Sequence, residues 1–148
     1  LVWYSVPMTE VTRLTELSRK DAEEIANNFP EHQFVAANVE KFFKDSENIL
    51  LIARTDKVIS GITIAYYLER LDKPAAQIFL DSIDVHPKFK RQGIGTRMIE
   101  KLKVLGKEKG ATELWVLTNR SNEAAMALYA STGGVSKERD VVMFDYSM

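Results

Sequence analysis

The fold is decided by the stretch Val85-His86-Pro87-Lys88-Phe89-Lys90-Arg91-Gln92-Gly93-Ile94-Gly95-Thr96. An apolar run from Ile78 to Val85 leads into it, and apolar residues at helical spacing follow from Ile94 to Leu105. This order predicts a strand, a glycine loop and a helix. Glycines let backbone amides approach a ligand closely, and the first turn of a helix offers unpaired N–H groups at its positive end. The stretch therefore predicts a site for a phosphorylated ligand.

The spacing of the glycines excludes two nucleotide-binding motifs. A dinucleotide fingerprint requires G-x-G-x-x-G, but Met98 stands where the third glycine would be. The P-loop pattern, G-x-x-x-x-G-K followed by Ser or Thr, is absent from the chain. The phosphorylated ligand is therefore expected to be of another kind.

The remaining pattern resembles the acetyl-CoA pyrophosphate loop of the GNAT acyltransferase superfamily. That loop has Arg or Gln, two variable residues, Gly, one variable residue, and Gly or Ala. Lys90 holds the first position here, without the bidentate fork of Arg. The resemblance implies acetyl-CoA as cosubstrate. Its predicted loop contacts are Lys90, Arg91, Gln92, Gly93, Ile94, Gly95 and Thr96.

A second stretch, Ser121 to Tyr129, follows an apolar run and resembles the family signature N-x-x-A-x-x-x-Y. The resemblance implies that Asn122 and Tyr129, two helical turns apart, lie beside the cofactor arm. A phenol with a pKa of about 10 is protonated at neutral pH and can donate to a departing thiolate. Tyr129 is therefore the predicted acid, and a tyrosine packed in the core is the alternative. Relatives continue Tyr-x-x-x-Gly-Phe, whereas this chain has Gly133-Gly134-Val135 after Tyr129-Ala-Ser-Thr and so lacks the aromatic residue.

Within the superfamily, the chain resembles the aminoglycoside 3-N-acetyltransferases from about Ile49 to Tyr146. The stretches that carry this likeness are Gly61–Tyr67, Gln77–Asp81, Arg91–Ile94, Ala127–Tyr129 and Val142–Asp145. The first-choice acceptor is therefore the 3-amino group of an aminoglycoside antibiotic, an activity that confers resistance. A polyamine, an amino acid or a protein amine is the alternative acceptor. A regulatory module that binds acyl-CoA without turnover is the alternative from another class.

Acetyl transfer requires a neutral amine, a stabilised oxyanion and a protonated thiolate. Regular alternation places Asp81 on the face of Phe79, Ile83 and Val85, as the base or the anchor of the amine. Asp84 falls on the opposite face unless a bulge exchanges the two acids, and a structural ion pair is the alternative for either. The resemblance implies that the strand backbone at Ile83 and Val85 binds the cofactor and the oxyanion. The predicted acceptor-binding residues are Tyr66, Glu69, Asp81, Asp84 and Asp145. Ser82 stands where this subfamily has an Asp.

Composition limits the other possibilities. A chain of 148 residues, 45% hydrophobic, is long enough for one core. It has no cysteine and two histidines, which excludes thiolate chemistry and argues against a metal site. No apolar run approaches the ~20 residues of a membrane span, and no signal peptide is evident, so a cytoplasmic protein is expected. Residues 1–7 are interpreted as a leader before Met8, and residues 8–148 as one GNAT domain.

Charge is distributed unevenly along the chain. Residues 86–110 carry eight Lys or Arg and two acids, net +6, which leaves −7 for the remainder. A basic segment suits a cofactor with several phosphates, and an acidic remainder suits a cationic small-molecule amine. A nucleic-acid partner is not expected, because Phe89 is the only aromatic residue in the basic segment. The resemblance also implies a possible homodimer, with the final strand as the contact.

The periodicity predicts the following elements. Strands are expected over 9–14, 49–54, 58–68, 76–85, 113–118 and 140–146, and helices over 18–29, 30–44, from Ile94 to before Gly110, and after Asn122. The fold class is α/β. The family resemblance implies one domain with a central mixed, mostly antiparallel sheet, splayed central strands, and helices on both faces.

Overall fold

The computed structural model describes residues 5–137 and 140–148. The chain divides into two compact units, the first ending at Leu117 and the second beginning at Thr118, and each is described by itself. Among the described residues, the first unit contains a five-stranded sheet and three α-helices, and the second contains one helix. None of the helices in the described part is long and apolar enough to cross a membrane.

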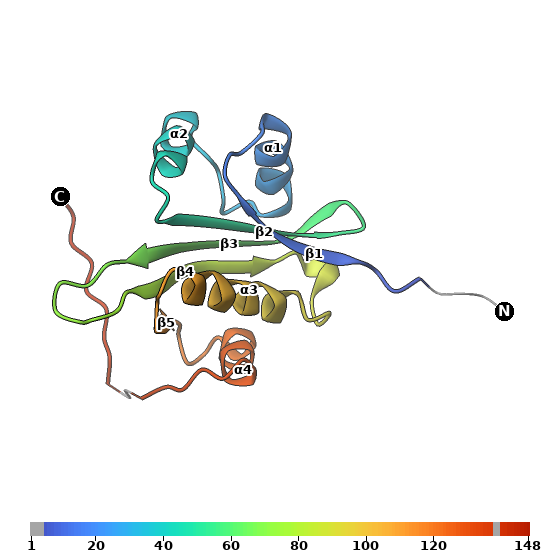
Figure 1. The fold of residues 1–148 in the computed structure, drawn as a ribbon. Coiled ribbons are helices and arrows are strands. Elements are labelled where there is room, and N and C mark those ends of the chain that lie inside the picture. The colour runs from blue at the N-terminus through green and yellow to red at the C-terminus, as the bar shows by residue number, and fades with distance from the viewer. Residues whose placement is uncertain (1–4, 138–139) are drawn as a thin grey trace. The chain divides into compact units, whose positions relative to one another are not determined.

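The sheet is mixed, with strand order β1-β2-β3-β4-β5. Neighbours are antiparallel from β1 to β4, and β4 and β5 are parallel. Helices α1 and α2 cover one face of this sheet and α3 covers the other (Figure 1). The elements in chain order are β1 (Thr9–Leu14), α1 (Arg19–Asn28), α2 (Ala36–Lys44), β2 (Asn48–Thr55), β3 (Val58–Leu68), β4 (Gln77–Val85), a short 3-10 turn η1 (Pro87–Phe89), α3 (Ile94–Glu108), β5 (Glu113–Val116) and α4 (Glu123–Ser131).

Apolar side chains cover both faces of the central strands. On the α1 face, Ile25 and Phe29 pack against buried residues of β2 and β3 that include Ile62. On the α3 face, Ile94 and Met98 form a second buried cluster with Ala53 of β2. Alternate residues of one strand therefore serve two cores, and the continuous apolar run of β2 follows from that.

Most of the predicted elements are confirmed. Strand β1 has the predicted bounds, and Ser18 caps α1 by accepting a bond from the amide of Asp21 at 3.0 Å. The β2–β3 turn places Asp56 at φ 48° and Lys57 at φ 72°, the conformation of a two-residue hairpin turn. Gly110, at φ 85°, directly follows Lys109, the C-cap residue of α3, as predicted.

The prediction for the second helix is wrong at its start. Helix α2 begins at Ala36, and the segment between α1 and α2 is not helical. The side chains of this segment form bonds that compete with a helix. His32 bonds to Asp84, and the Gln33 amide donates to the carbonyl oxygens of Ala26 and Pro30. The segment therefore crosses toward β4 before α2 begins.

The predicted final strand over 140–146 is also wrong, since the described residues of this segment form no strand. Strand-like composition does not form a strand unless a neighbouring edge accepts its backbone bonds. Val141, Val142, Met143, Phe144 and Tyr146 are all exposed. The homodimer contact was predicted through this strand, which the described residues 140–148 do not form. Strand β5 ends at Val116 rather than at residue 118.

Candidate active site

A bulge in β4 shapes the centre of the first unit. Ile64 of β3 faces Ser82, whereas the next residue, Ala65, faces Leu80. Asp81 is thus the extra residue of the bulge, and it is exposed. A bulge of one residue reverses the alternation of side chains beyond it.

The bulge corrects the predicted placement of the strand residues. Ile83 and Val85 pack against the cluster on the α3 face. Phe79 lies on the other face, because it stacks on Tyr66, which contacts Phe42 of α2. The prediction that Asp81 shares one face with Phe79, Ile83 and Val85 is therefore wrong.

Strand β4 has an open edge beyond the bulge. It pairs with β5 only over Gln77–Leu80, so the backbone from Asp81 to Val85 has no partner in β5. The family resemblance implied that the central strands splay apart, and the pairing of β4 with β5 ends at this point. The amide of His86 donates to the Ser60 carbonyl of β3 at 2.9 Å. Because backbone groups alternate along a strand, those of Ile83 and Val85 face the open edge.

The glycine loop leads from η1 into α3. Gly93 is the N-cap of α3, and its φ of 77° is a conformation that residues with a Cβ adopt with strain. Arg91 also has a positive φ, 62°. No side chain caps α3 and no acid lies in its first turn. The first amides of α3 are thus directed at the space above the loop, where an anion is favoured.

The loop side chains divide into two groups. Lys90, Arg91, Gln92 and Thr96 are exposed, as a phosphate-binding role requires. Ile94 is 1% exposed and belongs to the core on the α3 face, so only its backbone can take part in binding. The same holds for Ile83 and Val85, whose side chains pack against that core.

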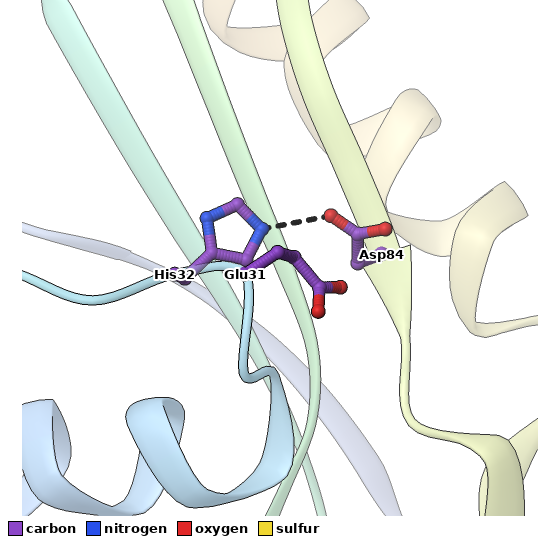
Figure 2. A group of neighbouring side chains, drawn as sticks. All are labelled: Glu31, His32 and Asp84. Atoms are coloured by element: carbon purple, nitrogen blue, oxygen red, sulfur yellow. Dashed lines mark hydrogen bonds and ion pairs between the residues drawn. The ribbon is translucent and has the colours of Figure 1, made fainter.

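The open end of β4 carries a residue that the sequence analysis missed. Nε2 of His32, in the segment between α1 and α2, lies 2.8 Å from Oδ2 of Asp84 (Figure 2). The hydrogen bond to Asp84 raises the pKa of His32 above its ordinary 6.5, and burial opposes this effect. The charges of Asp84, Glu31 and Asp81 raise it further. The sequence analysis missed His32 because it placed this residue in the predicted helix over 30–44, whereas the observed helix begins at Ala36.

A row of aromatic rings extends from α2 across the end of the sheet. Phe42 contacts Tyr66 edge to face at 6.2 Å, Tyr66 stacks on Phe79 at 6.4 Å, and Phe79 stacks on Trp115 at 4.4 Å. Burial raises the pKa of the Tyr66 phenol, and the charge of Asp81 raises it further. Tyr66 therefore lies near Asp81 with its hydroxyl protonated. Glu69 is exposed in the β3–β4 connection and is not brought to this cluster by any contact.

Glu31, His32 and Asp84 each offer a ligand atom within 4.8 Å of the others (Figure 2). The ion pair of His32 and Asp84 accounts for two of these groups, and Glu31 is exposed. We interpret the cluster as an ion pair beside a surface acid. Nearby, Oγ of Ser82 is buried without a hydrogen-bond partner among the described residues.

The second unit contains the other predicted site residues. Asn122 is the N-cap of α4, and its Oδ1 accepts a bond from the amide of Ala125 at 3.1 Å. Tyr129 is half-buried on α4. Asp145 is exposed on the segment that forms no strand. The cofactor roles of Asn122 and Tyr129 and the acceptor role of Asp145 stay predictions.

Residues 11–133 match the acetyltransferase (GNAT) family. The chain belongs to the GNAT family. Members of this family use acetyl-CoA, and the open edge of β4 and the uncapped start of α3 fit its pantetheine arm and its pyrophosphate.

Among curated GNAT relatives, the ribosomal protein bS18-alanine N-acetyltransferase of Escherichia coli (strain K12) is 34% identical over 74 residues, 50% of this chain and 49% of its own. The thialysine N-epsilon-acetyltransferase of Bos taurus is 32% identical over 68 residues, 46% of this chain and 40% of its own. The chain thus spans less than half the length of the curated relatives it matches.

Solved structures of similar fold include two aminoglycoside acetyltransferases from uncultured soil metagenomic samples. The first, meta-AAC0020, was solved with trehalose and has a TM-score of 0.83 at 22% identity, covering 95% of this chain and 96% of its own. The second, HMB0005, has a TM-score of 0.79 at 25% identity, covering 95% of this chain and 99% of its own. Both share the fold of this GNAT chain.

Proposed function

We propose that the protein is an acetyl-CoA-dependent N-acetyltransferase that acylates an amine of a small cationic acceptor. One observation carries this proposal. The bulge of β4 brings two acids to one imidazole, His32, beside the open strand edge. Asp84 is hydrogen-bonded to His32, and the charge of Asp81 acts on it as well. Two acids at the end of a strand that can hold an acyl donor are suited to binding an ammonium group and removing its proton.

The cofactor residues follow from the geometry of the first unit. Acetyl-CoA supplies the activated acetyl thioester. Backbone groups of Ile83 and Val85 at the open edge would hold its arm and stabilise an oxyanion. The amides from Gly93 to Thr96 would hold its pyrophosphate, with Lys90 and Arg91 as exposed cations beside them.

The acceptor residues supply charge and orientation. Asp81 and Asp84 would bind the ammonium form of the acceptor, and one of them would take its proton so that the neutral amine can attack. The second amine proton ends on the departing sulfur, with the Tyr129 hydroxyl as the predicted donor. Tyr66 would border this acceptor site with a protonated hydroxyl near Asp81. Glu69 and Asp145 stay predictions from the sequence for an acceptor with several amines.

Aminoglycosides are the first-choice acceptor. Two proteins that share this fold over 95% of the chain are aminoglycoside acetyltransferases, one of them 25% identical. Several carboxylates near one site suit a polyamine sugar. The 3-amino position stays a prediction from the sequence. Its test is the structure of the product, in which NMR would show the acetyl group on N3 or on another nitrogen.

A peptide amine is the second candidate acceptor. It is favoured by the 34% identity with the bS18-alanine N-acetyltransferase over half of this chain. A peptide beginning with alanine would place its α-amino group at the same acids. Because this site requires only one ammonium group, it does not by itself select between the two acceptors.

Thiol release from acetyl-CoA should be measured with aminoglycosides, polyamines, amino acids and an alanine peptide. Turnover with aminoglycosides, lowered in Asp81→Asn and in Tyr129→Phe, is the expected result. Turnover confined to the peptide would replace the first acceptor by the second. Tight acetyl-CoA binding without turnover of any amine would contradict the enzyme and favour a regulatory acyl-CoA-binding module.

A further inference from the structure

The ion pair between His32 and Asp84 joins two parts of the first unit that are far apart in sequence. His32 comes from the segment between α1 and α2, and Asp84 from the last part of β4. The His32 side chain is 12% exposed and that of Asp84 is 37% exposed. The imidazole is thus enclosed, whereas the carboxylate is partly open to a ligand.

The surroundings of His32 hold the ring in one orientation. Phe29 contacts it edge to face at 6.4 Å, and Phe34 lies at 6.4 Å on a tilted plane. Figure 2 shows one ring nitrogen directed at Asp84 and the other directed away. Because a carboxylate only accepts, Nε2 carries the proton in this bond. His32 therefore holds Oδ2 of Asp84 and leaves the other carboxylate oxygen for a ligand.

We propose that His32 is a positioning residue for acceptor recognition, which holds the Asp84 carboxylate toward the acceptor's ammonium group and sets, by its own charge, how strongly that carboxylate attracts it. This inference rests on the proposed function. It adds a residue that lies outside the strand and loop motifs of the sequence. It also gives Asp84 a role distinct from that of Asp81, which none of the described side chains holds by a hydrogen bond of this kind.

The charge of the pair gives the proposal a measurable consequence. Protonated His32 balances the charge of Asp84, whereas neutral His32 leaves the carboxylate with its full negative charge. The groups that face His32 are Asp84 and Asp81 from β4 and Glu31 from its own segment, all of which raise its pKa above 6.5. The KM for a cationic acceptor should therefore fall as the pH rises through this pKa. The KM for acetyl-CoA should not follow it.

The test compares three variants of the full chain, with EDTA present to exclude cations. His32→Gln keeps an N–H donor near the Nε2 position and cannot ionise, whereas His32→Ala removes the donor. His86→Gln is the matched control, because it leaves His32 as the only histidine of the chain. We expect His32→Ala to raise the acceptor KM about tenfold at pH 8, the effect of losing one charge-assisted bond. We expect His32→Gln to stay within about threefold of wild type there.

The pH profile separates positioning from a merely structural role. The inflection in acceptor KM should survive in His86→Gln and vanish in His32→Gln, which should bind the acceptor more tightly than wild type at pH 6. NMR titration of the two imidazoles gives a readout without turnover, and Asp84→Asn should lower the pKa of His32. An unchanged inflection in His32→Gln, or an unchanged His32 titration in Asp84→Asn, would overturn the inference. Absence of turnover with every amine, alongside the expected titration, would instead overturn the proposed function and leave the ion pair standing.

Discussion

Replacement of Gly93 by alanine should separate the binding role of the glycine loop from its contribution to stability. Gly93 has a φ of 77° at the start of α3, and an added Cβ would meet no atom within 4 Å. The cost is therefore conformational rather than steric, about 1–2 kcal/mol for a residue with a Cβ in this region. For a chain of this size it corresponds to a decrease in Tm of about 2–8 °C.

Gly110 provides a matched control at the other end of the same helix. Its φ is 85°, and an added Cβ would again meet no atom within 4 Å. Gly110→Ala should therefore lower the Tm by a similar amount. Only Gly93→Ala should weaken acetyl-CoA binding, because relief of the strain moves the first amides of α3. Misplacing one amide that donates to a charged phosphate loses about 1.5 kcal/mol, or about tenfold in Kd.

Calorimetric titration with CoA and thermal unfolding of both variants would check this prediction. The expected result is a shared loss of Tm and a CoA Kd that increases about tenfold in Gly93→Ala alone. Equal CoA affinities in the two variants would refute the reasoning, because the start of α3 would then not hold the cofactor.

Three further predictions concern single side chains. Asp81→Asn should lower kcat/KM for a cationic amine at least about tenfold. The control Asp72→Asn, which removes an exposed acid paired with Arg70, should leave kcat/KM within about twofold of wild type. Similar losses in both variants would contradict a specific role of Asp81 and indicate a general electrostatic effect. The pKa of His32 is raised in the folded state, so its contribution to the free energy of unfolding is present below pH 6.5 and lost as the pH rises through the folded-state pKa. Urea unfolding from pH 5 to 9 should show the free energy of unfolding fall over this range, and His32→Gln should remove that fall. Asn122→Ala should destabilise α4 by about 1 kcal/mol, and Asn122→Asp should keep the helix cap, because a carboxylate oxygen can accept the same bond. If Asn122→Asp loses CoA binding while its stability is unchanged, the side-chain amide also binds the cofactor.

Local rules predicted most of the first unit. The glycines, the capping residue Ser18 and the hairpin at Asp56 each act over a few residues, and their elements formed as expected. Two errors came from interactions that are distant in sequence. The start of α2 depends on bonds from His32 and Gln33, one of them to Asp84, 52 residues away. The final strand would have required an edge to pair with, which its own sequence does not provide.

The bulge at Asp81 is the feature that alternation could not reveal, and it has the largest effect on the site. A regular β4 would keep Asp81, Ile83 and Val85 on the face of Phe79, which lies toward α2, and would leave the core on the α3 face without Ile83 and Val85. One extra residue returns Ile83 and Val85 to that core and leaves Asp81 and Asp84 near His32 instead. The sheet then separates two charges. Figure 1 shows α3, which belongs to the basic segment 86–110, on one face and α1 and α2 on the other. Asp81 and Asp84 lie near His32, which belongs to the segment between α1 and α2. An anionic donor and a cationic acceptor would thus be attracted from opposite faces and meet at the open edge of β4. Added salt should therefore raise the KM of both substrates, and an effect on only one of them would contradict this division.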